Sequence, residues 1–114
     1  MTNRIVIGIT GASGVTYGVR MLRLLEDTNY ETHLIISEAG MLNIEIETGY
    51  KAEKVAAMAD YTYNHVNVSA SLASGSFLTE GMVVVPCTIK TLSGIANSYT
   101  ENLLVRAADV TLKE

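Results

Sequence analysis

The fold is decided by the stretch Ile5-Val6-Ile7-Gly8-Ile9-Thr10-Gly11-Ala12-Ser13-Gly14-Val15-Thr16-Tyr17-Gly18. Its first five residues carry no polar side chain, which is typical of a parallel strand covered on both faces. Gly11 and Gly14 bracket two small residues, so the backbone can turn sharply there and approach a ligand closely. A helical pattern begins at Val15. The stretch therefore predicts a strand, a tight turn and a helix whose amino-terminal N–H groups suit a phosphate.

The spacing of the glycines limits which phosphate compound fits. Glycines stand at positions 8, 11, 14 and 18, and no register gives the Gly-x-Gly-x-x-Gly fingerprint of dinucleotide-binding proteins. A P-loop is excluded because there is no lysine between Met1 and Tyr50. A turn that only lets the helix pack against the strand stays open as an alternative.

The composition indicates a cytoplasmic protein of one domain, part of whose surface is covered. Of the 114 residues, 48% are hydrophobic and only 18% are charged, so part of the surface is expected to be covered in an oligomer or against missing chain. A net charge of −4 without a basic stripe argues against nucleic-acid binding. We expect no transmembrane helix, no signal peptide and, with one cysteine, no internal disulfide.

The rest of the chain alternates between strand and helix patterns. After a strand at 4–10 and a helix at 15–27, we expect strands at 31–36, 61–63 and 81–86, and helices at 38–48, 51–59, 88–96 and 102–112. Ser37 can cap the second helix and Gly49 can end it. Thr88 or Thr91 can cap the helix that runs to about Ala96. This order predicts a three-layer open parallel sheet with helices on both faces. The turns at Gly11 and Thr88 then lie on one edge of the sheet, where ligands bind in such folds.

Several polar residues interrupt these patterns. His33 lies inside a strand, where a packed residue is commoner than a ligand, and His65 near the start of a long polar segment is expected to be exposed. Cys87 follows a buried strand and is either a small buried thiol or a nucleophile. Lys90 adds positive charge near the second turn. We expect no metal site, because no histidine, cysteine and carboxylate cluster has the spacing of metal ligands.

The whole chain, in order, resembles the UbiX family of flavin prenyltransferases, long described as subunits of phenolic or aromatic acid decarboxylases. The resemblance rests on Thr10-Gly11-Ala12-Ser13-Gly14, Tyr17-Gly18-Val19-Arg20, His33-Leu34-Ile35-Ile36-Ser37, Glu47-Thr48, Gly75-Ser76-Phe77, Pro86-Cys87-Thr88-Ile89-Lys90-Thr91-Leu92-Ser93-Gly94 and Arg106-Ala107-Ala108-Asp109-Val110-Thr111-Leu112-Lys113-Glu114. The last two segments are specific to the family. It implies a flavodoxin-like or Rossmann-like fold that binds FMN.

The resemblance also implies a reaction and its partners. Family members join a dimethylallyl group from dimethylallyl phosphate to reduced FMN without a metal, and the product serves a separate UbiD-type decarboxylase. They typically form dodecamers with active sites between subunits. They also continue well past the length of this chain, so residues 1–114 are expected to be one FMN-binding domain, truncated on its carboxyl-terminal side.

Site residues follow from the resemblance by position. Ser13 and Glu47 match residues close to the chemistry; the spacing alone does not distinguish Glu47 from Glu45. Flavin contacts are expected from Gly11, Ala12, Ser13, Ser37, Thr88, Ile89, Lys90 and Thr91.

Three other functions stay open. The first is a flavin-dependent decarboxylase of the same fold, acting on a peptidyl or pantothenoyl cysteine or on an aromatic acid. The second is a non-catalytic FMN-binding remnant. The third is a NAD-binding Rossmann protein, which the glycine spacing and Ser37 at the end of its strand disfavour.

Overall fold

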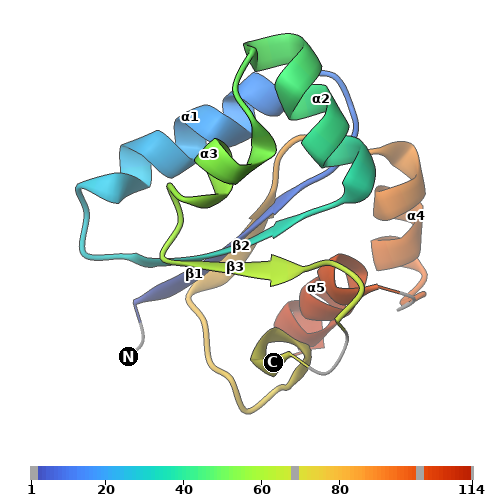
Figure 1. Cartoon of the computed structure of the whole chain (residues 1–114). Helices are drawn as coiled ribbons and strands as arrows, with labels where there is room; N and C mark the ends of the chain where they lie inside the picture. The colour runs from blue at the N-terminus through green and yellow to red at the C-terminus, as the bar shows by residue number, and fades with distance from the viewer. Residues whose placement is uncertain (1–2, 68–69, 100–101, 114) are drawn as a thin grey trace.

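The computed structural model, which describes residues 3–67, 70–99 and 102–113, contains a four-stranded parallel sheet (Figure 1). The strands are β1 (Arg4–Ile9), β2 (Glu31–Ile36), β3 (Tyr61–Asn64) and β4 (Gly81–Val84), in the spatial order β3-β2-β1-β4. β1 is central and pairs with both β2 and β4. The predicted parallel α/β sheet is thus confirmed, and the stretch that begins it supplies its middle strand.

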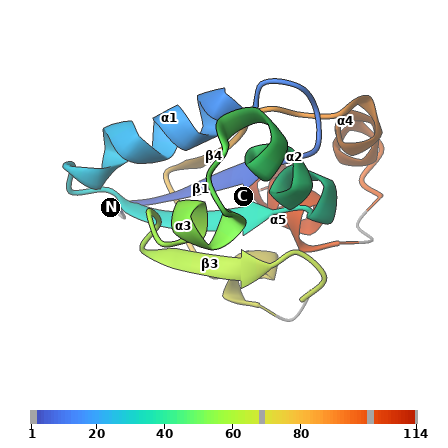
Figure 2. The ribbon, with the colours of Figure 1, turned by 45° about the horizontal axis from the view of Figure 1, so that its top comes forward.

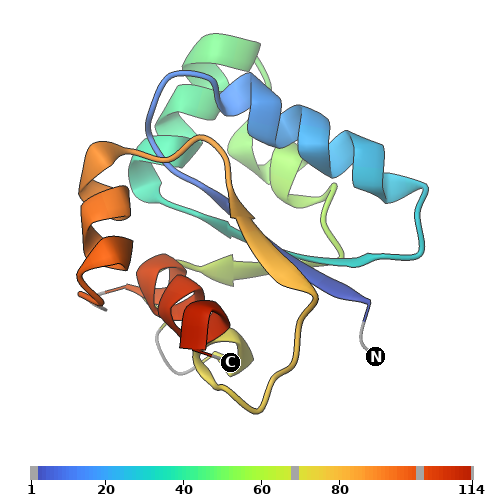
Figure 3. The ribbon, with the colours of Figure 1, turned by 180° about the vertical axis from the view of Figure 1, so that it is seen from behind.

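Helices cover both faces of the sheet. One face carries α1 (Val15–Glu26), α2 (Glu38–Thr48) and α3 (Ala52–Ala56), and the other carries the 3₁₀ turn η1 (Ser71–Ala73) and α5 (Leu103–Lys113) (Figures 1 and 3). The remaining helix, α4 (Ile89–Ala96), stands beside the sheet rather than on either face (Figure 2). None of its residues is fully buried.

Two apolar cores result from the alternation of side chains along the central strands. Ile7 and Ile9 of β1 point into the core beneath α1, α2 and α3, together with Leu34 and Ile36 of β2. Val6 points the other way, into a core formed with Ile35, Leu72, Leu103, Leu104 and Ala107. Because both faces of β1 are buried, the strand has the continuous apolar sequence from which it was predicted.

Local signals set several helix ends as expected. The Ser37 hydroxyl caps α2 by accepting a hydrogen bond from the Gly40 N–H at 3.0 Å, and Gly49 ends this helix with a φ of +76°. Thr88, rather than Thr91, caps α4. Among the described residues, no helix is both long and apolar enough to cross a membrane.

One part of the sequence-based reading is wrong in detail. The predicted helix at 51–59 is only Ala52–Ala56, because the residues after it form successive turns that lead to Asp60. The long polar segment after β3 contains η1, which buries Leu72 in the second core. Ala70, Ala73 and Phe77 of this segment pack against the same core. Residues 68–69 of the segment lie outside the described part.

Candidate functional site

A cavity of about 790 Å³ opens at the carboxyl end of the sheet, beside β1 and β2. Its wall is built from the turns after these strands, the beginning of α4 and the segments that flank α5. The lining residues are Thr10, Gly11, Ser37, Glu38, Ala39, His65, Thr88, Lys90, Thr91, Ser93, Gly94, Asn97, Tyr99, Asn102 and Val105. Segments from five parts of the chain thus converge on one space, which is the usual place for a ligand in an open α/β sheet.

The glycine turn after β1 is held against α2. A Cβ atom on Gly11 would overlap the side chain of Ala39, so only glycine lets the turn approach the helix so closely. Asn43 of α2 donates its side-chain N–H to the Gly11 carbonyl. Both carboxylate oxygens of Glu47 accept from the Gly14 N–H, at 3.2 and 3.4 Å. Gly14 caps α1 with a φ of +98°, a conformation that favours glycine.

The second turn, residues 85–88 after β4, is tied to the first through Thr10. Beyond the regular ladder, the Thr10 N–H donates to the Pro86 carbonyl at 3.2 Å, and the Thr10 hydroxyl donates to the same oxygen at 2.7 Å. That hydroxyl also accepts from the Thr88 N–H at 2.9 Å. The peptide bond before Pro86 is cis. The two turns therefore meet at one edge of the sheet, as predicted.

Hydroxyl groups are the main polar lining of the cavity. Each capping hydroxyl accepts one backbone N–H, from Gly40 to Ser37 and from Thr91 to Thr88, and the Thr88 and Thr91 hydroxyls lie 2.9 Å apart. Because a hydroxyl that accepts still has a proton to donate, Ser37 and the threonine pair can each donate to a bound anion. Lys90 adds an ammonium group and Glu38 a carboxylate to the same wall.

The predicted flavin contacts differ in whether they line the cavity. Gly11, Ser37, Thr88, Lys90 and Thr91 all line the cavity. Ala12, Ser13 and Ile89 belong to the same turns but are not among the lining residues.

Glu47 and Ser13 lie on the α2 side of the glycine turn. Glu47 is exposed and contacts the turn at Gly14, while Glu45 is exposed and makes no such contact. Ser13 is exposed, and its hydroxyl has no hydrogen-bond partner within the described ranges. The structure thus brings Glu47, but not Glu45, to the residue that follows Ser13.

The sequence reading missed part of the cavity wall. His65 was expected to be exposed, but it is half-buried, and its Nδ1 is buried without a hydrogen-bond partner among residues 3–67, 70–99 and 102–113. The reason is that the segment after β3 turns under α5, where the Leu103 N–H donates to the His65 carbonyl. Asn97, Tyr99 and Asn102 were also missed, although a polar run between two helices at this edge could have indicated them.

The surroundings of His33 and Cys87, the other candidates from the sequence, indicate structural roles. His33 is 2% exposed, and both ring nitrogens have partners, Glu31 Oε1 at 2.7 Å and the Tyr63 hydroxyl at 2.8 Å. Cys87 is half-buried, and burial raises the pKa of its thiol, so the nucleophilic thiolate is disfavoured at neutral pH. Within the described part of the chain, no cluster of three or more metal-ligating side chains occurs.

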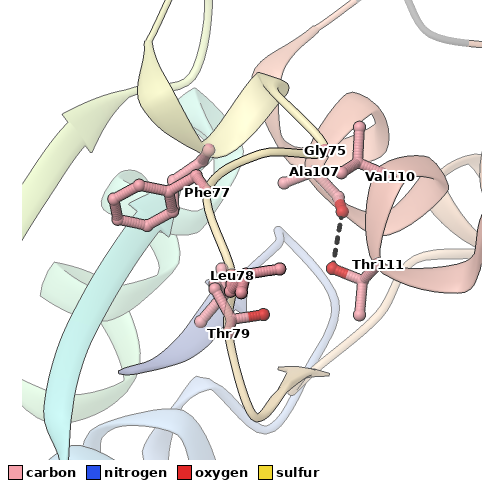
Figure 4. A pocket seen from close by; sticks show the side chains of 9 residues that line it. Gly75, Phe77, Leu78, Thr79, Ala107, Val110 and Thr111 are labelled. Atoms are coloured by element: carbon pink, nitrogen blue, oxygen red, sulfur yellow. Dashed lines mark hydrogen bonds between the residues drawn. The ribbon is translucent and has the colours of Figure 1, made fainter. Parts of the chain in front are cut away.

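A smaller cavity, of about 70 Å³, lies between α5 and the segment before β4 (Figure 4). Phe77, Leu78 and Val110 contribute to its wall, and the hydroxyl of Thr111 is directed to the Ala107 carbonyl of its own helix at 2.8 Å. No charged side chain lines it. Its small size and mostly apolar lining do not suit a cofactor, so the larger cavity is the candidate site.

Comparison with known proteins shows the family of the chain. The model of the family described as Flavoprotein matches residues 1–114. The chain belongs to this family. The flavoprotein is 56% identical over 112 residues to the probable UbiX-like flavin prenyltransferase of Sedimentibacter hydroxybenzoicus, and 54% identical over 112 residues to the flavin prenyltransferase UbiX of Escherichia coli K12. Both matches cover 97% of this chain and 59% of the relative.

Solved structures show the same fold at similar coverage. A dodecameric FMN-dependent UbiX-like decarboxylase from Escherichia coli O157:H7 matches with a TM-score of 0.95 and 48% identity, over 97% of this chain and 61% of that one. AnUbiX, in complex with FMN and dimethylallyl pyrophosphate, matches with a TM-score of 0.97 and 43% identity, over 100% of this chain and 61% of that one. The predicted UbiX resemblance is confirmed, and the flavoprotein spans about three-fifths of these relatives' length.

Proposed function

We propose that this flavoprotein is a flavin prenyltransferase, which joins a dimethylallyl group from dimethylallyl phosphate to reduced FMN. Residues 1–114 form its FMN-binding α/β domain. The observation that carries the proposal is the cavity at the carboxyl end of the sheet, where the glycine turn, the cap of α2 and the cap of α4 converge. It supports a mononucleotide flavin because the glycine spacing does not suit a dinucleotide.

The residues present fit FMN. Gly11 has no side chain, so the turn can pack closely against α2 and its backbone can lie close to a ligand. The hydroxyls of Ser37, Thr88 and Thr91 and the ammonium group of Lys90 can hold a phosphate or ribityl chain beside the amino terminus of α4. Three predicted contacts lie outside the wall, Ala12, Ser13 and Ile89, and they are proposed to reach the flavin from the ends of the two turns.

Two residues of this chain are proposed to act in the reaction. Reduced FMN, when bound, supplies a nucleophilic ring nitrogen, and the prenyl phosphate is the electrophile. Ser13 has a hydroxyl without a partner in the described structure and is proposed to donate it to the prenyl phosphate as the carbon–oxygen bond breaks. Glu47, fixed on the Gly14 N–H beside Ser13, is proposed to accept or return a proton.

The test is to incubate the full chain with reduced FMN and dimethylallyl phosphate and to follow the mass of the flavin. We expect one added five-carbon unit. Ser13→Ala should lower the rate by about 100-fold, as loss of a transition-state hydrogen-bond donor does, whereas Ser76→Ala, at an exposed serine before β4, should not change it. Release of CO2 from a cysteine-terminated or aromatic acid without prenylation would favour the decarboxylase alternative, and FMN binding with neither reaction the non-catalytic one.

The wider setting of the enzyme is also proposed. A UbiD-type decarboxylase would receive the prenylated flavin. A homo-oligomer is supported by apolar side chains at the surface of α2 and α4, among them Ile46, 70% exposed, and Ile89, 84% exposed. The cytoplasmic location predicted from the sequence stays a prediction.

A further inference from the structure

Thr10 is a buried residue placed between the two turns that the proposed function assigns to FMN. Its side chain is 2% exposed, yet it borders the cavity. Its hydroxyl makes two hydrogen bonds to residues more than 70 positions away, donating to the Pro86 carbonyl at 2.7 Å and accepting from the Thr88 N–H at 2.9 Å. The hydroxyl is therefore committed to the protein, and Thr10 acts on a ligand only through its neighbours.

The neighbour that matters is α4. Thr88 is the cap of this helix, and the helix has no buried residue to hold it against the sheet. The Thr88 hydroxyl accepts from the Thr91 N–H at 3.1 Å, so Thr10, Thr88 and Thr91 form a continuous chain of hydrogen bonds from β1 to the first turn of α4. These bonds tie the Thr88 and Thr91 hydroxyls to the turn after β1.

We propose that Thr10 is a positioning residue for FMN: its hydroxyl sets the distance between the glycine turn and the amino terminus of α4. This inference rests on the proposed function, because it takes FMN as the ligand held between the two turns. A change at Thr10 should therefore weaken FMN binding more than its effect on folding explains.

A matched control exists at the opposite end of the sheet. Thr32 of β2 is 3% exposed, and its hydroxyl also accepts a backbone N–H, from Asp60 at 2.9 Å, and donates to the carboxylate of Asp60 at 3.2 Å. Thr32 does not line the cavity. Thr10→Val and Thr32→Val thus remove equivalent buried hydroxyls, one beside the cofactor turns and one far from them.

The experiment measures the FMN dissociation constant and the unfolding midpoint of the full chain. We expect Thr10→Val to raise the dissociation constant about tenfold, the effect of one or two net hydrogen bonds. Thr10→Ser, which keeps the hydroxyl, should stay within about threefold of the unsubstituted chain, and Thr32→Val should bind FMN normally although its midpoint falls similarly. If Thr10→Val does not fold, Thr10→Ala, which leaves space instead of placing a methyl group against the Pro86 carbonyl, replaces it.

Normal FMN binding by Thr10→Val, or equal weakening by Thr32→Val, would overturn the proposal. Failure of the unsubstituted chain to bind FMN would instead overturn the proposed function. In that case the amide signals of residues 11–14 and hydrogen exchange at Thr88, compared between the unsubstituted chain and Thr10→Val, test the positioning separately. Altered signals and faster exchange support the positioning, and unchanged ones refute it.

Discussion

The two ends of the parallel sheet use polar residues in opposite ways. Toward the amino end, His33 lies in a closed cluster, where its ring nitrogens form hydrogen bonds with Glu31 and Tyr63. The rings of Tyr61 and Phe77 pack against it. At the carboxyl end, His65 borders an open cavity, and its buried Nδ1 has no partner in the part of the chain that the structure describes. One histidine is satisfied by the fold, and the other lies where a ligand would bind.

This difference teaches how to separate structural from functional polar residues in this chain. A carboxylate can only accept, so Glu31 fixes the His33 proton on Nε2, and Nδ1 accepts from the Tyr63 hydroxyl. Every hydrogen-bonding group of that ring is used internally. The capping hydroxyls of Ser37 and Thr88 instead accept from the backbone and leave donor capacity facing the cavity. Substitutions at the two ends should therefore affect different measurements.

The largest effect is expected at the amino end, from His33→Ala. Losing a buried ring with two hydrogen bonds should lower the free energy of unfolding by about 3 kcal/mol, measured by urea denaturation. FMN binding by the folded protein should remain normal. Tyr63→Phe, which removes only the hydroxyl partner of Nδ1, should cost about 1 kcal/mol. A His33→Ala protein that folds stably but no longer binds FMN would contradict the structural role assigned to the amino end of the sheet.

A slightly smaller effect is expected at the carboxyl end, from Gly11→Ala. The added methyl group overlaps Ala39 and must push the glycine turn away from α2, at a cost of about 2 kcal/mol, or about 30-fold in the FMN dissociation constant. Fluorescence titration of FMN measures this. Gly81→Ala, where a Cβ meets nothing within 4 Å, is the matched control and should bind normally. Equal binding by both variants would contradict the proposed close packing of the turn.

The smallest effect concerns Cys87, beside the second turn. Because burial raises the pKa of its thiol, Cys87 stays protonated at neutral pH. Alkylation by iodoacetamide at pH 8 should be a few-fold slower in the folded protein than in the urea-unfolded chain. Cys87 is the only cysteine in the sequence, so the measured alkylation rate is that of this residue. Faster alkylation of the folded protein would restore the nucleophile interpretation.

Much of this fold could be predicted because the relevant signals are local. The apolar run of β1, the Ser37 cap and the Gly49 stop each act within a few residues, and the structure has them where the sequence indicates. The polar segment after β3 carries no such local signal, because its order comes from Leu72, whose burial depends on α5 about 30 residues later. For the same reason His65 was expected at the surface.

By itself, the sequence determined the parallel α/β order, the two turns after buried strands and the UbiX resemblance, since strand periodicity, helix caps and motifs are properties of adjacent residues. Only the tertiary structure decided which polar groups meet. It joined Thr10 to Pro86 and Thr88, placed Glu47 rather than Glu45 on the glycine turn, and brought His65 to the cavity. These contacts link residues 33 to 78 positions apart or depend on distant packing, and no local pattern encodes such distances.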